Sequence, residues 1–227
     1  MGIGRRHFAE WWSALLSPER GGRIVSGVSR FDGFDRTVFL GVAAMYSIYG
    51  ISMGMPRGMV PAVVSGLKLP LLYLLTLLVC FPPFYVLNQL IGPRVGARGC
   101  VRLLLLATSV NAIAIVSYAP ASYFFTLTTS TSTLSGYRFL LVMHVIVFAL
   151  AGAISLLAIH VLFRAAAMQL GRPLRPEFLG VFGGVYALVG TQMSWTLRPW
   201  VGSWAIDYAP FRAIEGSFVE ALIRLLE

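Results

Sequence analysis

The chain has 227 residues, of which 57% are hydrophobic and 12% are charged, and its mean hydropathy is +0.77. A soluble domain has about 45–50% apolar and about 25% charged residues, so this composition is untypical of a soluble globule. The net charge of +9 does not indicate nucleic acid binding, because the basic residues are spread between apolar runs along the whole chain. The two cysteines, Cys80 and Cys100, are too few for a disulfide framework. The sequence therefore predicts a multi-pass membrane protein.

Apolar runs of about 20 residues can cross a hydrocarbon core roughly 30 Å thick as helices. Five such runs occur, at residues 37–55, 67–91, 101–126, 139–163 and 178–197. Because proline removes a helix hydrogen bond, we expect a kink at Pro82 and Pro83 in the second run, and an early end or a bend near Pro120 in the third.

The predicted fold is an all-α membrane protein with five transmembrane helices and an amphipathic interfacial helix at each end. Residues 1–36 form a cytoplasmic N-terminal segment, residues 37–197 form the five-helix transmembrane domain, and residues 198–227 form a tail on the outer side. The orientation follows from the basic residues: 12 of them lie in the N-terminal segment and the second and fourth connections, and six lie on the opposite side. Cytoplasmic flanks are typically enriched in Lys and Arg, so the N-terminus is predicted inside and the C-terminus outside.

Both interfacial helices are predicted from apolar stripes at helical spacing. The N-terminal stripe comprises Phe8, Trp11, Trp12, Leu15 and Leu16, beside arginines and before a break at Ser17-Pro18. The alternative there is a loosely attached tail with accidental periodicity. The C-terminal stripe comprises Phe211, Ile214, Phe218, Leu222 and Leu225, and follows Trp195, Trp200 and Trp204. That stripe could lie in the membrane interface or pack on a partner subunit.

Carboxylates are absent from the membrane-spanning region. No Asp or Glu occurs between residues 37 and 176, or in the run at 178–197. Intramembrane carboxylates usually carry protons or bind hard cations, so their absence disfavours a proton-coupled transporter and a carboxylate-bridged metal enzyme. Ser65, in Val64-Ser65-Gly66, lacks the first glycine expected of an intramembrane serine protease, and no His–Asp pair is positioned to complete a triad. No enzyme, metal site or resident cofactor is therefore expected.

Two histidines remain candidates for binding a cofactor. His144 and His160 lie in the fourth run, about 160° apart around the helix and roughly 24 Å apart along it. They cannot share a metal or a haem, and packing or interfacial roles are the more common ones for such residues. A pigment that needs one axial ligand could still use either histidine.

Two cations lie beside prolines at predicted outer span boundaries. Lys68 precedes Pro70 at the start of the second run, and Arg198 precedes Pro199 at the end of the fifth. They could extend separately to lipid head groups, or together line an outer site for an anion.

Small-xxx-small patterns let helix backbones approach closely. Gly50 and Gly54 form one such pair, and Gly180 and Gly184 form another. Both pairs predict helix contacts, either inside the bundle or between protomers.

Residues 49–54 (YGISMG), 68–77 (KLPLLYLLTL), 81–82 (FP) and 192–199 (QMSWTLRP) resemble a group of uncharacterised bacterial five-span membrane proteins. That group is similar in layout to the Yip family, which has a cytoplasmic N-terminal region and five spans. The eukaryotic Yip members work with small GTPases in membrane traffic. The resemblance implies a bacterial inner membrane protein and transfers no site residue.

The leading functional prediction is a non-enzymatic membrane scaffold or accessory subunit, in contact with the lipid bilayer and with a membrane protein partner or a second copy. The alternative is a small transporter, channel or lipid-handling protein for an anionic ligand. The third possibility is a cofactor- or pigment-binding subunit that uses His144 or His160. A wet cavity reaching Lys68 and Arg198 would favour the transporter class, whereas a dry, fully packed bundle would favour the scaffold.

Overall fold

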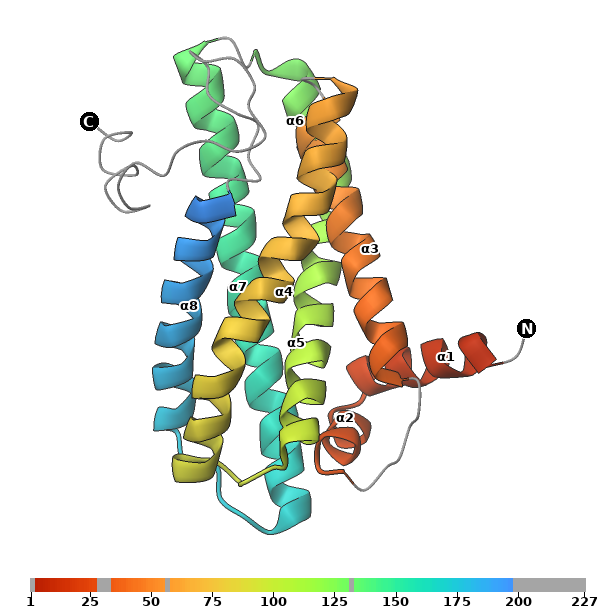
Figure 1. The fold of residues 1–227 in the computed structure, drawn as a ribbon, viewed down its shortest axis with the longest axis vertical. Coiled ribbons are helices and arrows are strands. Elements are labelled where there is room, and N and C mark those ends of the chain that lie inside the picture. The colour runs from red at the N-terminus through yellow and green to blue at the C-terminus, as the bar shows by residue number, and fades with distance from the viewer. Residues whose placement is uncertain (1–2, 28–33, 56–57, 131–132, 198–227) are drawn as a thin grey trace.

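The computed structural model describes residues 3–27, 34–55, 58–130 and 133–197 (Figure 1). Those residues contain helices and connections but no strand, which confirms the all-α prediction. The eight helices are α1 (Ile3–Leu16), α2 (Pro18–Val25), α3 (Phe34–Gly54), α4 (Met59–Ile91), α5 (Ala97–Ser117), α6 (Ala119–Thr128), α7 (Leu134–Leu170) and α8 (Glu177–Leu197). The predicted interfacial helix of the tail and Arg198 lie outside the described residues.

Four helical stretches are long and apolar enough to cross a membrane, where the sequence predicted five. They are Arg36–Gly54, Met59–Ile91, Ala97–Thr128 and Leu134–Leu170. α8 has 21 residues but is not among the four. Its glycines and the polar pair Thr191 and Gln192 dilute its apolar residues. The structure thus supports a multi-pass membrane protein with four candidate spans.

The second predicted span is longer than expected and begins at Met59 rather than at residue 67. Small residues allow this extension, because α3 and α4 pack as a close antiparallel pair there. A Cβ on Gly50 would meet the carbonyl oxygen of Ser65 and would lie 2.9 Å from Gly66 Cα. Lys68 therefore lies inside α4, not at its boundary. Three prolines are accommodated within α4, which follows a bent path in Figure 1.

The expected break near Pro120 is present. α5 ends at Ser117 and α6 begins at Ala119, so that Pro120 occupies the first turn of α6, where its missing N–H costs nothing.

α7 is also longer than its predicted apolar run. It begins after Thr133, whose side chain accepts a hydrogen bond from Gly136 N, and it ends at Leu170, before Gly171, whose φ of 61° suits a left-handed cap.

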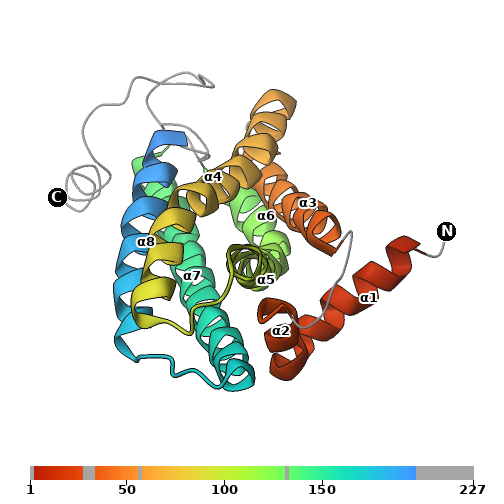
Figure 2. The same ribbon diagram turned by 60° about the horizontal axis from the view of Figure 1, so that its bottom comes forward.

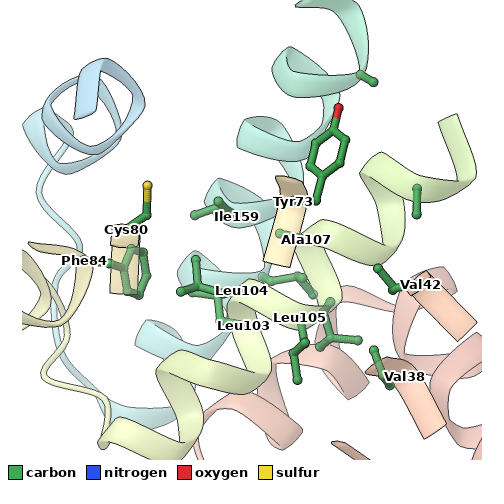
Figure 3. Close-up of a cluster of buried hydrophobic side chains, with 14 of the residues drawn as sticks. Val38, Val42, Tyr73, Cys80, Phe84, Leu103, Leu104, Leu105, Ala107 and Ile159 are labelled. Carbon is green, nitrogen blue, oxygen red and sulfur yellow. The ribbon is translucent and has the colours of Figure 1, made fainter. Parts of the chain in front are cut away.

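α5 lies at the centre of the bundle, with α2, α3, α4 and α7 around it (Figure 2). Apolar side chains of α5, such as Leu103, Leu104 and Ala107, meet Val38 and Val42 from α3 and Ile159 from α7 in one buried cluster (Figure 3). The central position of α5 explains why the polar residues on it have to find partners within the protein.

α1 docks on the bundle mainly through Trp11 of its apolar stripe, and the partly buried Leu15 packs against the same core. Trp11 is 1% exposed; its Nε1 donates to Ser109 Oγ at 3.1 Å, and its ring would lie 3.1 Å from a Cβ on Gly41. The other large stripe residues, Phe8, Trp12 and Leu16, are exposed. The helix and its break at Pro18 are as expected. Its apolar stripe, however, is partly buried against the bundle and partly exposed.

α8 is attached to the bundle mainly through α4 and touches α7 at only a few positions. Phe178 and Phe182 pack against Phe84 of α4, with ring centroids 5.4 and 4.7 Å away, and Phe178 also packs against Phe163 of α7 at 4.9 Å. These aromatic contacts hold the first half of α8. Its second half lines, together with α4 and α7, the cavity described next.

Candidate functional site

A cavity of about 400 Å³ lies between α4, α7 and α8, and we call it the central groove. It is partly open, and its surface is mainly apolar. The lining residues are Leu72, Tyr73, Thr76, Asn111, Val145, Phe148, Ala149, Gly152, Ala153, Leu156, Tyr186, Ala187, Gly190, Thr191 and Ser194. Ten of them belong to stretches that are long and apolar enough to cross a membrane.

Glycines make room for the central groove. No atom lies within 4 Å of the position that a Cβ on Gly152 would occupy, and a Cβ on Gly190 would meet only Thr76 Cγ2, at 3.9 Å. Larger side chains at these two positions would project into empty space. The volume of the groove therefore depends on residue size at a few helical positions, and it can be filled without moving a helix.

Asn111 places an amide in the wall of the central groove. The residue is 1% exposed, and its Oδ1 lies 2.8 Å from the Tyr46 hydroxyl, which donates to it. The other end of the amide, Nδ2, has no hydrogen-bond partner among the described residues. Whichever end of the amide faces Tyr46, the other end is left without a partner. A buried amide without a partner costs about 1–3 kcal/mol, so a polar group of a ligand would be stabilised there.

Lys68 lies one helical turn before Leu72 in α4 and does not line the groove. Its side chain is buried, and Nζ donates to the carbonyl oxygen of Leu197, the last residue of α8, at 3.0 Å. A cation at the carbonyl end of a helix is favourable because that end carries partial negative charge. The structure thus places Lys68 on the end of α8, where it holds that helix to α4.

We expect Lys68→Glu to loosen α8, because a carboxylate would replace the donor and face the negative end of the helix. Loss of a hydrogen bond from a charged donor costs about 1.5–3 kcal/mol. The Tm of the purified protein in mild detergent should fall clearly in Lys68→Glu, whereas Lys68→Arg, which keeps a cationic donor, should stay near the wild type. Equal melting of Lys68→Glu and wild-type protein would contradict this role.

The two candidate histidines lie in different surroundings. His144 is 1% exposed; its Nδ1 lies 2.8 Å from the Tyr49 hydroxyl, and its ring packs against those of Tyr49 and Phe148. Its Nε2 has no hydrogen-bond partner among the described residues. His160 lines a second cavity nearer the end of α7. The described residues hold no group of three or more His, Cys, Asp or Glu that could bind a metal.

The two predicted glycine pairs have different surroundings as well. Gly50 and Gly54 lie against the backbone of α4, and a Cβ on Gly54 would be 2.6 Å from Ala62 Cα. Gly180 and Gly184 are exposed on α8, and nothing lies within 4 Å of their Cβ positions. The first pair thus serves packing inside the chain, whereas the second pair leaves a smooth open surface.

The second cavity, which we call the basic pocket, has a volume of about 520 Å³. It lies at the end of α7 and along the connection to α8, and is lined by His160, Arg164, Ala167, Met168, Gly171, Arg172, Pro173, Leu174 and Pro176. Arg164 and Arg172 belong to the fourth connection between the predicted spans, whose basic residues contributed only to the predicted orientation. The sequence feature that could have indicated a site is the spacing of His160 and Arg164, which puts them on one helix face.

No family model, curated protein or solved structure matches this chain. The resemblance to five-span bacterial proteins and to the Yip layout stays a prediction.

Proposed function

We propose that this chain is a non-enzymatic integral membrane protein that binds a lipid-like molecule from the bilayer in the central groove. The observation that supports this best is a partly open, mainly apolar cavity of about 400 Å³ whose wall holds an Asn111 amide group without a partner. Apolar pockets with a few polar groups are typical ligand sites. A lipid acyl chain matches the lining, and an ester or hydroxyl oxygen matches the amide.

The lipid-handling class is favoured over an ion or proton carrier by the chemistry of the groove. Its lining includes no carboxylate and no Lys or Arg. A permeating ion needs charged or strongly polar groups along its path. The groove also ends one turn short of Lys68, so it does not join the outer cation site that the sequence suggested.

The proposal includes a fifth span and a defined orientation in a bacterial inner membrane. α8 has 21 residues, close to the roughly 20 needed to cross, and it runs alongside α4 and α7 (Figure 1). α1, α2 and the α4–α5 and α7–α8 connections gather at one end of the bundle (Figure 1). Twelve of the 18 basic residues belong to residues 1–36, 94–102 and 164–175, which comprise these segments and the chain next to them in the sequence. This bias supports a cytoplasmic position. The exposed Phe8, Trp12 and Leu16 of α1 suit the membrane interface at that end.

The test fills the groove without disturbing the helices. Gly152→Leu combined with Gly190→Leu should project into the cavity, whereas Gly180→Leu combined with Gly184→Leu makes the same chemical change on the open surface of α8. Native mass spectrometry of protein purified in mild detergent should show bound lipid on the wild type and on the control pair. The groove-filled pair should lose most of it. Equal lipid retention in both pairs would contradict a lipid site in the groove.

A second candidate function is that of an accessory subunit, in which α8 receives a helix of another membrane protein or of a second copy. The observation that favours it is the exposed pair Gly180 and Gly184, with empty space over both. Gentle purification from native membranes, followed by mass spectrometry, should then recover a stoichiometric partner. Gly180→Leu combined with Gly184→Leu should release that partner, and an unchanged yield of the complex would contradict this docking surface.

A further inference from the structure

We propose that the basic pocket binds the phosphate group of an anionic phospholipid whose acyl chain occupies the central groove. This inference rests on the proposed lipid binding and specifies which lipid the site selects. It combines the two cavities, which the sequence did not connect, into one amphiphilic site with an apolar part and a cationic end.

The two cavities follow one another along the same face of α7. Leu156 lines the central groove, whereas His160 and Arg164, one and two turns further along, line the basic pocket. Residues four apart lie on one side of a helix. A molecule that extends along this side of α7 would therefore pass from one cavity to the other.

The lengths also agree. Arg164 and Gly152 are separated by roughly 18 Å along the helix axis, at 1.5 Å per residue. One leaflet of hydrocarbon is about 15 Å thick, half of the usual core. If the guanidinium group of Arg164 lies at the level of the head groups, an acyl chain of that leaflet reaches the part of the groove beside Gly152.

The charges in the basic pocket suit a phosphate. Its lining contains two guanidinium groups and an imidazole but no carboxylate. Arg172 is held in place by its Nη1, which donates to the carbonyl oxygens of Pro93 and Arg94 at 3.4 Å each. Glu177 begins α8 directly after Pro176 and is not part of the lining. Guanidinium groups bind phosphate oxygens with paired, charge-assisted hydrogen bonds.

The rest of the pocket favours a lipid phosphate over a free one. Ala167, Met168 and Leu174 contribute apolar surface beside the two arginines, and Val161, one residue beyond His160, is exposed on α7. A soluble phosphate gains nothing from such surroundings, whereas the glycerol and first methylene groups of a lipid can contact them.

The test compares two variants that lose the same net charge. Arg164→Gln combined with Arg172→Gln removes both guanidinium groups from the pocket, and Arg98→Gln combined with Arg175→Gln removes two exposed ones from the same end of the bundle, outside its lining. Each protein is reconstituted in vesicles of equal parts phosphatidylglycerol and phosphatidylcholine. The protein is then extracted in mild detergent, and native mass spectrometry measures the ratio of the two bound lipids.

We expect the wild type and the control pair to prefer phosphatidylglycerol. In the pocket pair, the ratio of bound phosphatidylglycerol to phosphatidylcholine should fall about tenfold, because charge-assisted hydrogen bonds to the phosphate are lost. The pocket pair should still carry lipid, because its groove is intact. Two results would overturn the proposal of an anionic site and leave the proposed function standing. One is that the wild type binds both lipids without preference, and the other is that both pairs lose the preference equally. A wild type without lipid would overturn the proposed function itself.

A second arm separates a lipid phosphate from a free one. Inorganic phosphate is titrated into wild-type protein and into Gly152→Leu combined with Gly190→Leu, and binding is followed by calorimetry. Little or no heat from either protein supports a site that needs the acyl chain. Equal, tight binding of inorganic phosphate by both proteins would overturn the lipid assignment in favour of a soluble anion.

Discussion

Replacing Gly54 with leucine is expected to separate α3 from α4 and to prevent stable folding of the bundle. A Cβ at residue 54 would meet the carbonyl oxygen of Pro61 and would lie 2.6 Å from Ala62 Cα. Both obstacles are backbone atoms, so no side chain can turn away, and one helix has to move. Overpacking of this kind costs about 1–3 kcal/mol and occasionally more. The rest of the leucine side chain adds to the clash.

Gly180→Leu is the matched control, because it makes the same substitution inside a helix where nothing lies within 4 Å of the Cβ position. Leucine is a better helix former than glycine by several tenths of a kcal/mol, so this variant should melt at or slightly above the wild-type Tm. The measurement is the fraction of monodisperse protein after heating in detergent. A Gly54→Leu protein as stable as Gly180→Leu would show that α3 and α4 do not pack in this way.

Trp11→Ala is expected to release α1 from the bundle, whereas α2 stays packed on α7. Trp11 is 1% exposed and provides the main anchor of α1, both through its ring and through the bond from Nε1 to Ser109. Truncating a buried aromatic side chain to alanine costs about 3–5 kcal/mol. Trypsin should then cleave at Arg5 and Arg6 in α1 much faster than in the wild type. Trp11→Phe, which keeps a ring and loses the hydrogen bond, should lie between the two.

The neighbouring Trp12 supplies the control for this experiment. It is 45% exposed and belongs to the same apolar stripe in the sequence. Trp12→Ala removes a side chain of the same size and should leave trypsin cleavage of detergent-solubilised protein close to the wild-type rate. Similar cleavage of the Trp11→Ala and Trp12→Ala proteins would contradict the anchoring role of Trp11.

The membrane class and most of the helices could be predicted from the sequence, because these depend on local properties. The length and apolarity of a run decide whether it can span a bilayer, and proline ends a helix through its own geometry. Local sequence properties predicted the break before α6, the end of α1 before Pro18 and helices at the four candidate spans. The extent of α4 was not, because the segment before residue 67 becomes helical by packing on α3.

The candidate site was only partly accessible. Lys68 was identified as a cation at a boundary, but its partner, the carbonyl oxygen of Leu197, lies far away in the sequence. The two glycine pairs have the same spacing, yet one meets a helix backbone and the other meets empty space. Nothing in the sequence indicates that Asn111 lines a cavity, because any polar residue in a span can form a hydrogen bond to a neighbouring helix.

The sequence by itself determined that the chain is helical, apolar and almost free of acids between its tails, and it indicated which end of the bundle is basic. Only the tertiary structure decided which helices touch. α8 packs mainly on α4. Together with α4 and α7 it leaves the central groove beside Asn111 unfilled, and the groove and the basic pocket with Arg164 and Arg172 follow one another along α7. The physical reason is that hydropathy and helix propensity are summed along neighbouring residues, whereas a cavity is the space that distant segments leave unfilled.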